Sequence, residues 1–141
     1  ILGSLAAQHG WKYKLHPRRL YTFALDGKAP LPPSPPPTLA KPLDAPEFKV
    51  DTALAEHGRG LYAASCLYCH GAGMVSGGTA PDLRESPIPT NREAFEGVVR
   101  KGALRPNGMP QFAELTDKDI DGLMHFIRLR ARESLPGVAA R

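Results

Sequence analysis

Both cysteines of the chain lie in one short stretch, residues 64–73, which reads ASCLYCHGAG. Cys66 and Cys69 are three residues apart, and His70 directly follows the second cysteine. One helical turn places the two thiols on one side of the chain, where they can bond the two vinyl groups on one edge of a porphyrin while His70 binds the iron. Since Cys-x-x-Cys-His is the attachment signature of c-type haem, the sequence predicts covalent haem c with His70 as one axial ligand.

Three other uses of a cysteine pair remain open, but for each of them this sequence lacks a feature that such a site normally has. A disulfide scaffold normally has several cysteines, whereas this chain has two. A zinc site needs four ligands, and this stretch supplies three at most unless His57 or His125 joins from a distance. A redox-active dithiol of the thioredoxin type lies in a strand–helix–strand unit, which the sequence does not predict here. The motif therefore favours haem.

The far side of the iron needs a second ligand if the haem is to be restricted to electron transfer, because an open position binds gases or peroxide. The chain has three methionines. Met74 lies only four residues after His70, too close along the chain to pass around the porphyrin edge, and Met124 has the spacing of a core position on a helix. Met109 lies in the loop RPNGMPQF, with a proline on either side. We predict that Met109 is the second axial ligand.

Helices are expected on either side of this motif. Asp51 can cap a helix over residues 52–65, whose apolar residues recur at helical spacing. Gly58 falls inside that helix and costs about 1 kcal/mol relative to alanine, so the close approach of another helix is expected to compensate it.

Two further helices are predicted by their capping residues. Thr90 and Glu93 form a capping-box pattern ahead of a short helix of about three turns. Thr116 and Asp119 repeat the pattern ahead of the terminal helix. No strand is predicted after residue 50, so the fold class is mainly α, with three to four helices around the haem.

The first third of the chain has a different character. Residues 30–46 hold eight of the fifteen prolines, and this run predicts a linker that would span on the order of 50 Å as polyproline II. Ahead of it, residues 18–28 alternate bulky and smaller side chains and end in Asp26-Gly27, which predicts a strand running into a turn. A single strand has two unpaired edges, so its partners must come from another chain or a larger parent protein.

Charge and hydropathy exclude two functional classes. Residues 1–49 carry seven Lys or Arg against three acids, whereas residues 50–141 carry eleven of each. The basicity therefore lies outside the helical region, and no basic stripe with interleaved aromatic residues predicts nucleic-acid binding. No apolar run is long enough for a membrane span, and the first ten residues lack the pattern of a secretion signal.

Residues 50–135 resemble a class I cytochrome c. In that family an aromatic residue lies four positions before the first cysteine, here Tyr62, and packs on the terminal helix. The segment TAPDL resembles the family's Gly-Pro-x-Leu, which implies that the Pro81 carbonyl accepts the Nδ1 proton of His70 and fixes the ring. Ala80 replaces the usual glycine, a mild departure.

A closer resemblance covers nearly the whole chain. GWKYKLHPRRLYTFALDGKAPLP, the proline linker, GGTAPDLRESP and RPNGMPQFAELT resemble the C-terminal end of quinohaemoprotein alcohol dehydrogenases, which join a PQQ-containing propeller to a cytochrome c domain. The resemblance implies four parts: residues 1–29 as the last propeller segment, 30–49 as linker, 50–135 as the cytochrome c domain, and 136–141 as a tail.

The same resemblance implies a function. The haem would accept electrons from reduced PQQ and pass them to a copper protein, another cytochrome or a quinone-linked membrane subunit, in the periplasm. This chain alone would hold no PQQ or calcium site and would not be an enzyme. Three alternatives stay open: a free-standing periplasmic shuttle, a haem sensor or peroxidase whose sixth ligand is labile, and an arm over residues 1–49 that docks the cytochrome on a separate dehydrogenase.

Three more residues are candidates to contact the haem. Arg84, just past the Pro81 segment, and Arg105, just before the Met109 loop, could pair with the haem propionates. Phe112, at the end of the same loop, is a further candidate.

Overall fold

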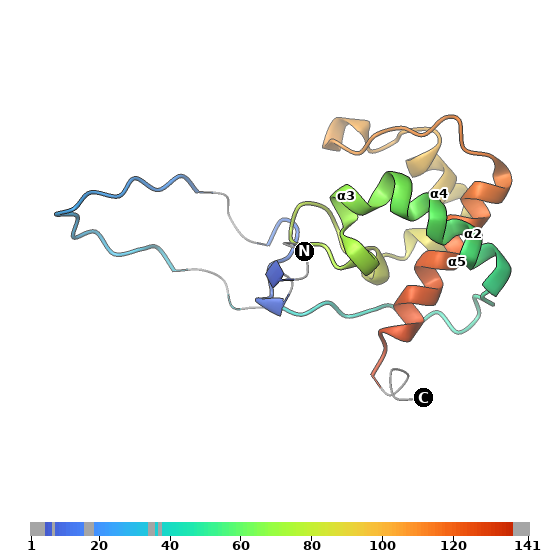
Figure 1. Ribbon diagram of the computed structural model, residues 1–141, viewed down its shortest axis with the longest axis horizontal. Coiled ribbons are helices and arrows are strands. Elements are labelled where there is room, and N and C mark those ends of the chain that lie inside the picture. The colour runs from blue at the N-terminus through green and yellow to red at the C-terminus, as the bar shows by residue number, and fades with distance from the viewer. Residues whose placement is uncertain (1–4, 7, 16–18, 34–35, 37, 137–141) are drawn as a thin grey trace.

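The computed structural model describes residues 5–6, 8–15, 19–33, 36 and 38–136. The named helices of this part form one helical body, from which residues 19–33 project as a long excursion of the chain (Figure 1). The described residues contain no strand, so the mainly α fold class is confirmed. None of the helices in this described part has the length and apolarity needed to cross a membrane.

The first helix of the body carries the cysteine motif. Helix α2 (Thr52–Leu61) begins as predicted at Asp51, whose carboxylate accepts hydrogen bonds from the next backbone amides at 2.8 and 3.0 Å. The chain then continues without a break through a π-helical turn, η1 (Tyr62–Cys66), into α3 (Leu67–His70). Single π-helical turns inside α-helices often occur at functional sites, and this one leads directly into the cysteine–histidine motif.

Helix α4 (Arg92–Val99) begins at a different residue from the one predicted. The N-cap is Asn91, whose side chain accepts from the amide of Ala94 at 2.9 Å. The prediction of Thr90 as the cap is wrong, because the Thr90 hydroxyl instead donates to the Pro87 carbonyl at 2.7 Å.

Helix α5 (Asp117–Glu133) is the longest in the body and supplies most of the core. It begins at the predicted capping box, in which Thr116 and Asp119 bond each other's backbone amides. Its buried apolar residues pack with those of α2, α4 and the loops; the core comprises Ala55, Tyr62, Met74, Phe95, Val99, Ile120, Leu123, Met124, Phe126 and Ile127. This confirms the reading of Met124 as a core residue.

Helices α2 and α5 cross at closely apposed glycines (Figure 1). A Cβ atom on Gly58 would overlap the backbone carbonyl of Gly122, so the predicted compensation for Gly58 by a second helix is confirmed. One turn further on, the rings of Tyr62 and Phe126 meet with their centroids 5.5 Å apart. The crossing fixes the helix that leads into the cysteine motif.

Short 3₁₀ turns connect these helices and bring the loops over the space between them. They are η2 (Ala72–Met74), η3 (Leu83–Glu85), η4 (Ile88–Thr90) and η5 (Arg105–Asn107).

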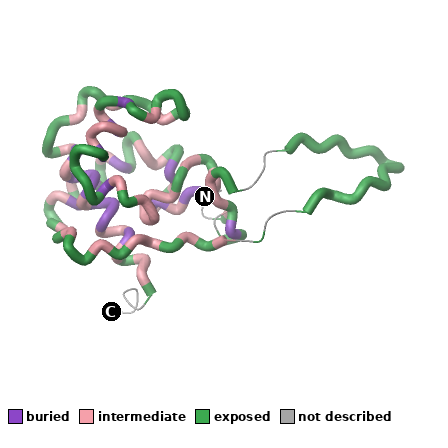
Figure 2. Tube along the Cα trace, turned by 180° about the vertical axis from the view of Figure 1, so that it is seen from behind, coloured by how far each residue is buried: buried purple, intermediate pink, exposed green. Residues whose placement is uncertain are grey.

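The predicted strand is absent from the described residues 19–28. A turn does occur at its end, where the Gly27 amide donates to the Ala24 carbonyl at 3.1 Å. The side chains on either side are exposed, with Leu20 97% and Phe23 80% accessible (Figure 2). The described part of the chain offers this segment no partner strand, so its backbone forms no sheet hydrogen bonds there.

The predicted linker is not a free spacer along its whole length. Its described residues 30–33 are exposed, but from Lys41 onward the chain runs along the helical body (Figures 1 and 2). The Leu43 amide donates to the Arg84 carbonyl at 2.9 Å, and the Arg132 guanidinium donates to the Phe48 carbonyl, also at 2.9 Å. Phe48 in turn packs on the ring of His125.

Candidate cofactor site

A cavity of about 430 Å³ opens between the helices, a volume typical of small-molecule and cofactor sites. Its lining comes from the end of α2 through α3, from α4, from the loop over residues 104–115 and from α5. Its apolar lining comprises Leu61, Leu83, Ile88, Phe95, Val98, Val99, Leu104, Phe112, Leu115, Leu123 and Ile127. A flat apolar molecule with a few polar groups fits such a lining.

Both cysteines line this cavity as free thiols. Cys66 is half-buried and Cys69 is exposed. Burial, with a smaller contribution from Cys69, raises the pKa of the Cys66 thiol to about 11, so Cys66 is uncharged at neutral pH. The two sulfur atoms therefore stand at the rim of the cavity, unbonded to each other and in reach of a group inside it.

One ring nitrogen of His70 is already used, which leaves the other available to a ligand. Nδ1 lies 2.9 Å from the Pro81 carbonyl oxygen. A carbonyl can only accept, so Nδ1 carries the proton and Nε2 keeps its lone pair. His70 is 7% exposed, and this burial lowers its pKa, with the Pro81 bond opposing the shift. The residue is thus a neutral imidazole held in the tautomer that binds metals.

The loop after His70 is built to hold that proline in place. Gly71 has φ +82°, and a Cβ there would collide with the Val75 carbonyl, so only glycine fits the turn. The Ser76 hydroxyl donates to the Ala80 carbonyl and closes the loop just before Pro81. Ala80, the departure from the family pattern, is accommodated there.

Met109 also lines this cavity. Its loop is anchored at both ends, because the Met109 amide donates to the Leu104 carbonyl at 3.3 Å and the Phe112 amide donates to the Val99 carbonyl at 2.9 Å. Met74 and Met124, by contrast, are 0% and 5% exposed in the core and are absent from the cavity lining.

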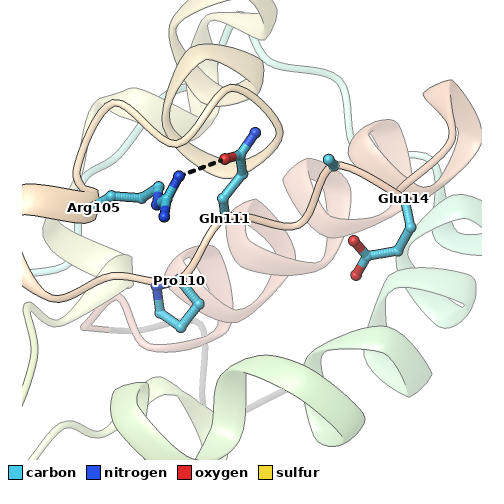
Figure 3. A pocket seen from close by; sticks show the side chains of 5 residues that line it. Arg105, Pro110, Gln111 and Glu114 are labelled. Atoms are coloured by element: carbon cyan, nitrogen blue, oxygen red, sulfur yellow. Dashed lines mark hydrogen bonds between the residues drawn. The ribbon is translucent and has the colours of Figure 1, made fainter.

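The structure brings most of the predicted site residues together. Cys66, Cys69, His70, Pro81, Tyr62, Met109 and Phe112 all line the one cavity. Arg84 does not: its guanidinium is bound to the Asp82 carboxylate at 2.6 Å, and its side chain is absent from the lining. Arg105 borders a separate, shallow surface pocket with Pro110 and Glu114, and donates to Gln111 at 3.3 Å (Figure 3).

The two histidines proposed as distant zinc ligands lie elsewhere. His57 Nε2 is 2.7 Å from an Asp119 carboxylate oxygen, and His125 Nδ1 accepts from the Asp51 amide at 2.8 Å. Within the residues that the structure describes, no group of three or more His, Cys, Asp or Glu side chains could hold a metal ion. The zinc alternative therefore has no support from the described geometry.

Several lining residues were not predicted from the sequence, and two of them come from a distant part of the chain. Tyr13 and Lys14, from the segment before the linker, line the same cavity as the CxxCH motif. They lie more than fifty residues before Cys66, and no local pattern connects them with it. Proximity in the fold alone identifies them.

This fold and this site define a cytochrome c domain. The profile of the family described as "Cytochrome C oxidase, cbb3-type, subunit III" matches residues 53–127, and the chain belongs to this cytochrome c family. The family implies haem c, and the CxxC pair of Cys66 and Cys69 is present in the chain. The chain is also homologous to the C-terminal region of quinohaemoprotein alcohol dehydrogenases.

Two curated relatives illustrate this homology. Quinohemoprotein alcohol dehydrogenase ADH IIB from Pseudomonas putida is 44% identical over 117 residues, which are 82% of this chain and 17% of the relative. The dehydrogenase subunit of a quinone alcohol dehydrogenase from Gluconobacter oxydans (strain 621H) is 36% identical over 135 residues, 95% of this chain and 17% of the relative. The chain thus spans about a sixth of the length of these relatives.

A solved structure agrees. Quinohemoprotein alcohol dehydrogenase from Comamonas testosteroni matches with a TM-score of 0.59 and 33% identity, covering 78% of this chain and 16% of that one.

Proposed function

We propose that this chain transfers electrons through a haem c bonded to Cys66 and Cys69 and ligated by His70 and Met109. One observation carries the proposal: His70 and Met109 line the same largely apolar cavity as both cysteines. Cys66, Cys69 and His70 supply the bonds of the attachment motif, and Met109 supplies a neutral sulfur ligand from a loop held at both ends.

The covalent step needs no outside oxidant or reductant. Cys66 and Cys69 would hold the haem by adding their thiols to its two vinyl groups, and each S–H and C=C pair of bonds would be replaced by a C–S thioether bond and a C–H bond.

The chain's own residues set the redox properties of the site. When bound, haem supplies a one-electron couple, Fe(III)/Fe(II). Met109 ligation and the apolar walls favour the less charged ferrous state and so raise the reduction potential. The Pro81 carbonyl holds the His70 ring and increases its basicity toward iron.

The relatives suggest the donor and the acceptor. Their names describe alcohol dehydrogenases that use a quinone, so we assign reduced PQQ of a quinohaemoprotein dehydrogenase as the electron donor. The acceptor would be a respiratory component of the periplasm: a copper protein, another cytochrome or a quinone-linked membrane subunit. Alcohol oxidation itself would take place on the parent dehydrogenase, and this chain would relay the electrons.

The ligand assignment is tested by optical spectra of the protein matured with haem. Met109→Ala should lose the low-spin six-coordinate signature and bind carbon monoxide rapidly when reduced, whereas the original should not. Met124→Leu is the matched control, because it removes a core methionine with little change in volume.

Two outcomes would overturn the proposal. A wild-type protein without covalently bound haem would refute haem attachment. Rapid, stoichiometric carbon monoxide binding by the reduced wild type would refute Met109 as a stable ligand and favour a sensor or peroxidase with an open sixth position.

A further inference from the structure

A segment outside the helical body forms part of the cavity wall. Residues 10–14, here named the N-terminal strap, bring Tyr13 and Lys14 to the cavity rim beside Thr79 and Pro81. The contact is close, because a Cβ atom on Gly78 would lie 3.7 Å from the backbone of Lys12. The strap therefore covers the side of the cavity on which the Pro81 loop holds His70.

Glu85 ties the strap to the body. Its carboxylate accepts from the Lys12 ammonium at 2.8 Å and from the Lys41 amide at 2.7 Å, so one side chain anchors both the strap and the returning linker. A direct bond joins the same two stretches, since the Thr38 amide donates to the Gly10 carbonyl at 3.2 Å. Glu85 lies four residues after Pro81, so one short segment serves both His70 and the strap.

The strap also brings charge to the cavity. Among the described lining residues, Lys14 is the one with a formal positive charge, and none is acidic. Its ammonium lies 5.3 Å from the centroid of the Tyr13 ring. Lys14 has φ +60°, an uncommon backbone conformation for a lysine, and the turn is closed by a bond from the Leu15 amide to the Lys12 carbonyl at 3.3 Å. Arg84, the predicted partner of a haem carboxylate, is already neutralised by Asp82.

We propose that the N-terminal strap is part of the cofactor site: Lys14 binds a carboxylate of the haem, and Glu85 is the positioning residue that holds Lys14 there. The inference rests on the proposed haem function. A cation at the cavity rim stabilises the reduced, less positive iron centre, and the strap excludes water from that side. Both effects raise the reduction potential.

Two substitutions in the full chain separate this role from simple charge effects. Lys14→Met removes a cation and should lower the reduction potential. Glu85→Ala removes an anion, which acting directly would raise the potential, but it also releases Lys12 and Lys41. If the strap positions Lys14, Glu85→Ala should lower the potential instead. We expect about a threefold decrease in the reduction equilibrium constant for each, or about 28 mV at 59 mV per tenfold for one electron.

The second readout is hydrogen exchange, which does not need haem. The control is Glu56→Ala, which removes an exposed carboxylate that pairs with Arg59 on α2, away from the cavity, and should change neither the reduction potential nor the exchange rates. Hydrogen exchange of the amides in residues 10–14 should speed up in Glu85→Ala and stay unchanged in Lys14→Met and Glu56→Ala. In the double variant the Glu85→Ala change should not lower the potential further.

The outcomes distinguish this inference from the function on which it rests. A wild-type protein that holds no haem refutes the proposed function, and the exchange experiment then still reports on the Glu85 anchor. A haem-loaded protein whose potential is unchanged by Lys14→Met, or raised by Glu85→Ala, refutes the inference alone.

Discussion

Gly58 and Gly122 lie in direct backbone contact where α2 crosses α5. A Cβ atom on either one would press against the other helix: against the Gly122 carbonyl in one case, and within 2.9 Å of the His57 ring in the other. The contact at Gly58 is with backbone atoms, so no rotamer change can relieve it. The crossing places the end of α2, and hence the cysteine motif, against the terminal helix.

Gly58→Ala should destabilise the domain by about 3 kcal/mol or more, since overpacking a contact that cannot yield costs at least this upper range. Gly60 provides the matched control on the same helix, because a Cβ there meets nothing within 4 Å. Gly60→Ala should stabilise the domain by about 0.5–1 kcal/mol through helix propensity. Urea unfolding of the two variants measures the difference. Equal effects would contradict the crossing.

Tyr62→Phe should reduce stability by about 1–2 kcal/mol. The Tyr62 hydroxyl donates to the Gly71 carbonyl at 2.6 Å, and burial raises its pKa, so the bond persists across the neutral range. The substitution keeps the ring packing on Phe126 but leaves the carbonyl without its donor. Tyr68→Phe is the control, since Tyr68 is 86% exposed and should change stability by less than about 0.5 kcal/mol. Thermal unfolding compares the two, and a Tyr62→Phe protein as stable as the control would refute the bond.

Acid should weaken the start of α5 through Asp119. Hydrogen bonds from Thr116 and His57 lower the pKa of this carboxyl from about 3.8 to about 2. A lowered pKa means that the carboxylate stabilises the fold above pH 4 and that this contribution is lost as pH falls toward 2. Asp119→Asn should cost about 1–2 kcal/mol at pH 7 and flatten the stability profile between pH 4 and 2.

The measurement for Asp119 is the urea midpoint across that pH range. Asp44→Asn, at an exposed position, serves as the control and should leave the profile unchanged. A profile for Asp119→Asn that parallels the original would show that the capping box does not titrate as described.

Two arginines, the buried Arg128 and the half-buried Arg84, should respond oppositely to the same substitution. Arg128 is 3% exposed, its Nε and Nη1 atoms have no hydrogen-bond partner among the described residues, and burial lowers its pKa. Arg84 is paired with Asp82, whose side chain is 9% exposed. Arg128→Met should change stability by less than about 1 kcal/mol, or increase it, because an uncompensated desolvation cost is removed.

Arg84→Met should cost about 3 kcal/mol, because it leaves a buried carboxylate without its cation. Chemical denaturation of both variants provides the comparison. A greater loss of stability in Arg128→Met than in Arg84→Met would contradict this prediction. It would mean that the hydrogen bond from Arg128 Nη2 to the Arg84 carbonyl, at 3.1 Å, outweighs the desolvation cost of the unpartnered Nε and Nη1 atoms.

Local chemistry could be predicted from the sequence wherever the interacting residues are neighbours along the chain. The Asp51 cap, the box at Thr116 and Asp119, and the cysteine motif all depend on contacts within a few residues. The exception is Thr90, because Asn91 beside it is an equally good cap and the Thr90 hydroxyl already serves a 3₁₀ turn.

Contacts between residues far apart in the sequence were predicted only where one of the residues carried an energetic cost that needed compensation. Gly58 predicted a crossing helix because a glycine inside a helix needs compensation. Nothing near Lys14 or Glu85 carries such a signal, so the strap was missed. The strand at residues 18–28 failed for a related reason, since its pattern describes a pairing for which the described chain supplies no partner.

The packing of residues 41–50 on the helical body changes where the cytochrome unit should be considered to start. The bonds that join Leu43 to Arg84 and Phe48 to Arg132 of α5 mean that trimming at residue 50 would strip a covering layer from the terminal helix. A minimal version of the helical body should retain the polypeptide from about Thr38 onward, and a graft to another redox enzyme that is to keep the N-terminal strap should fuse upstream of Gly10.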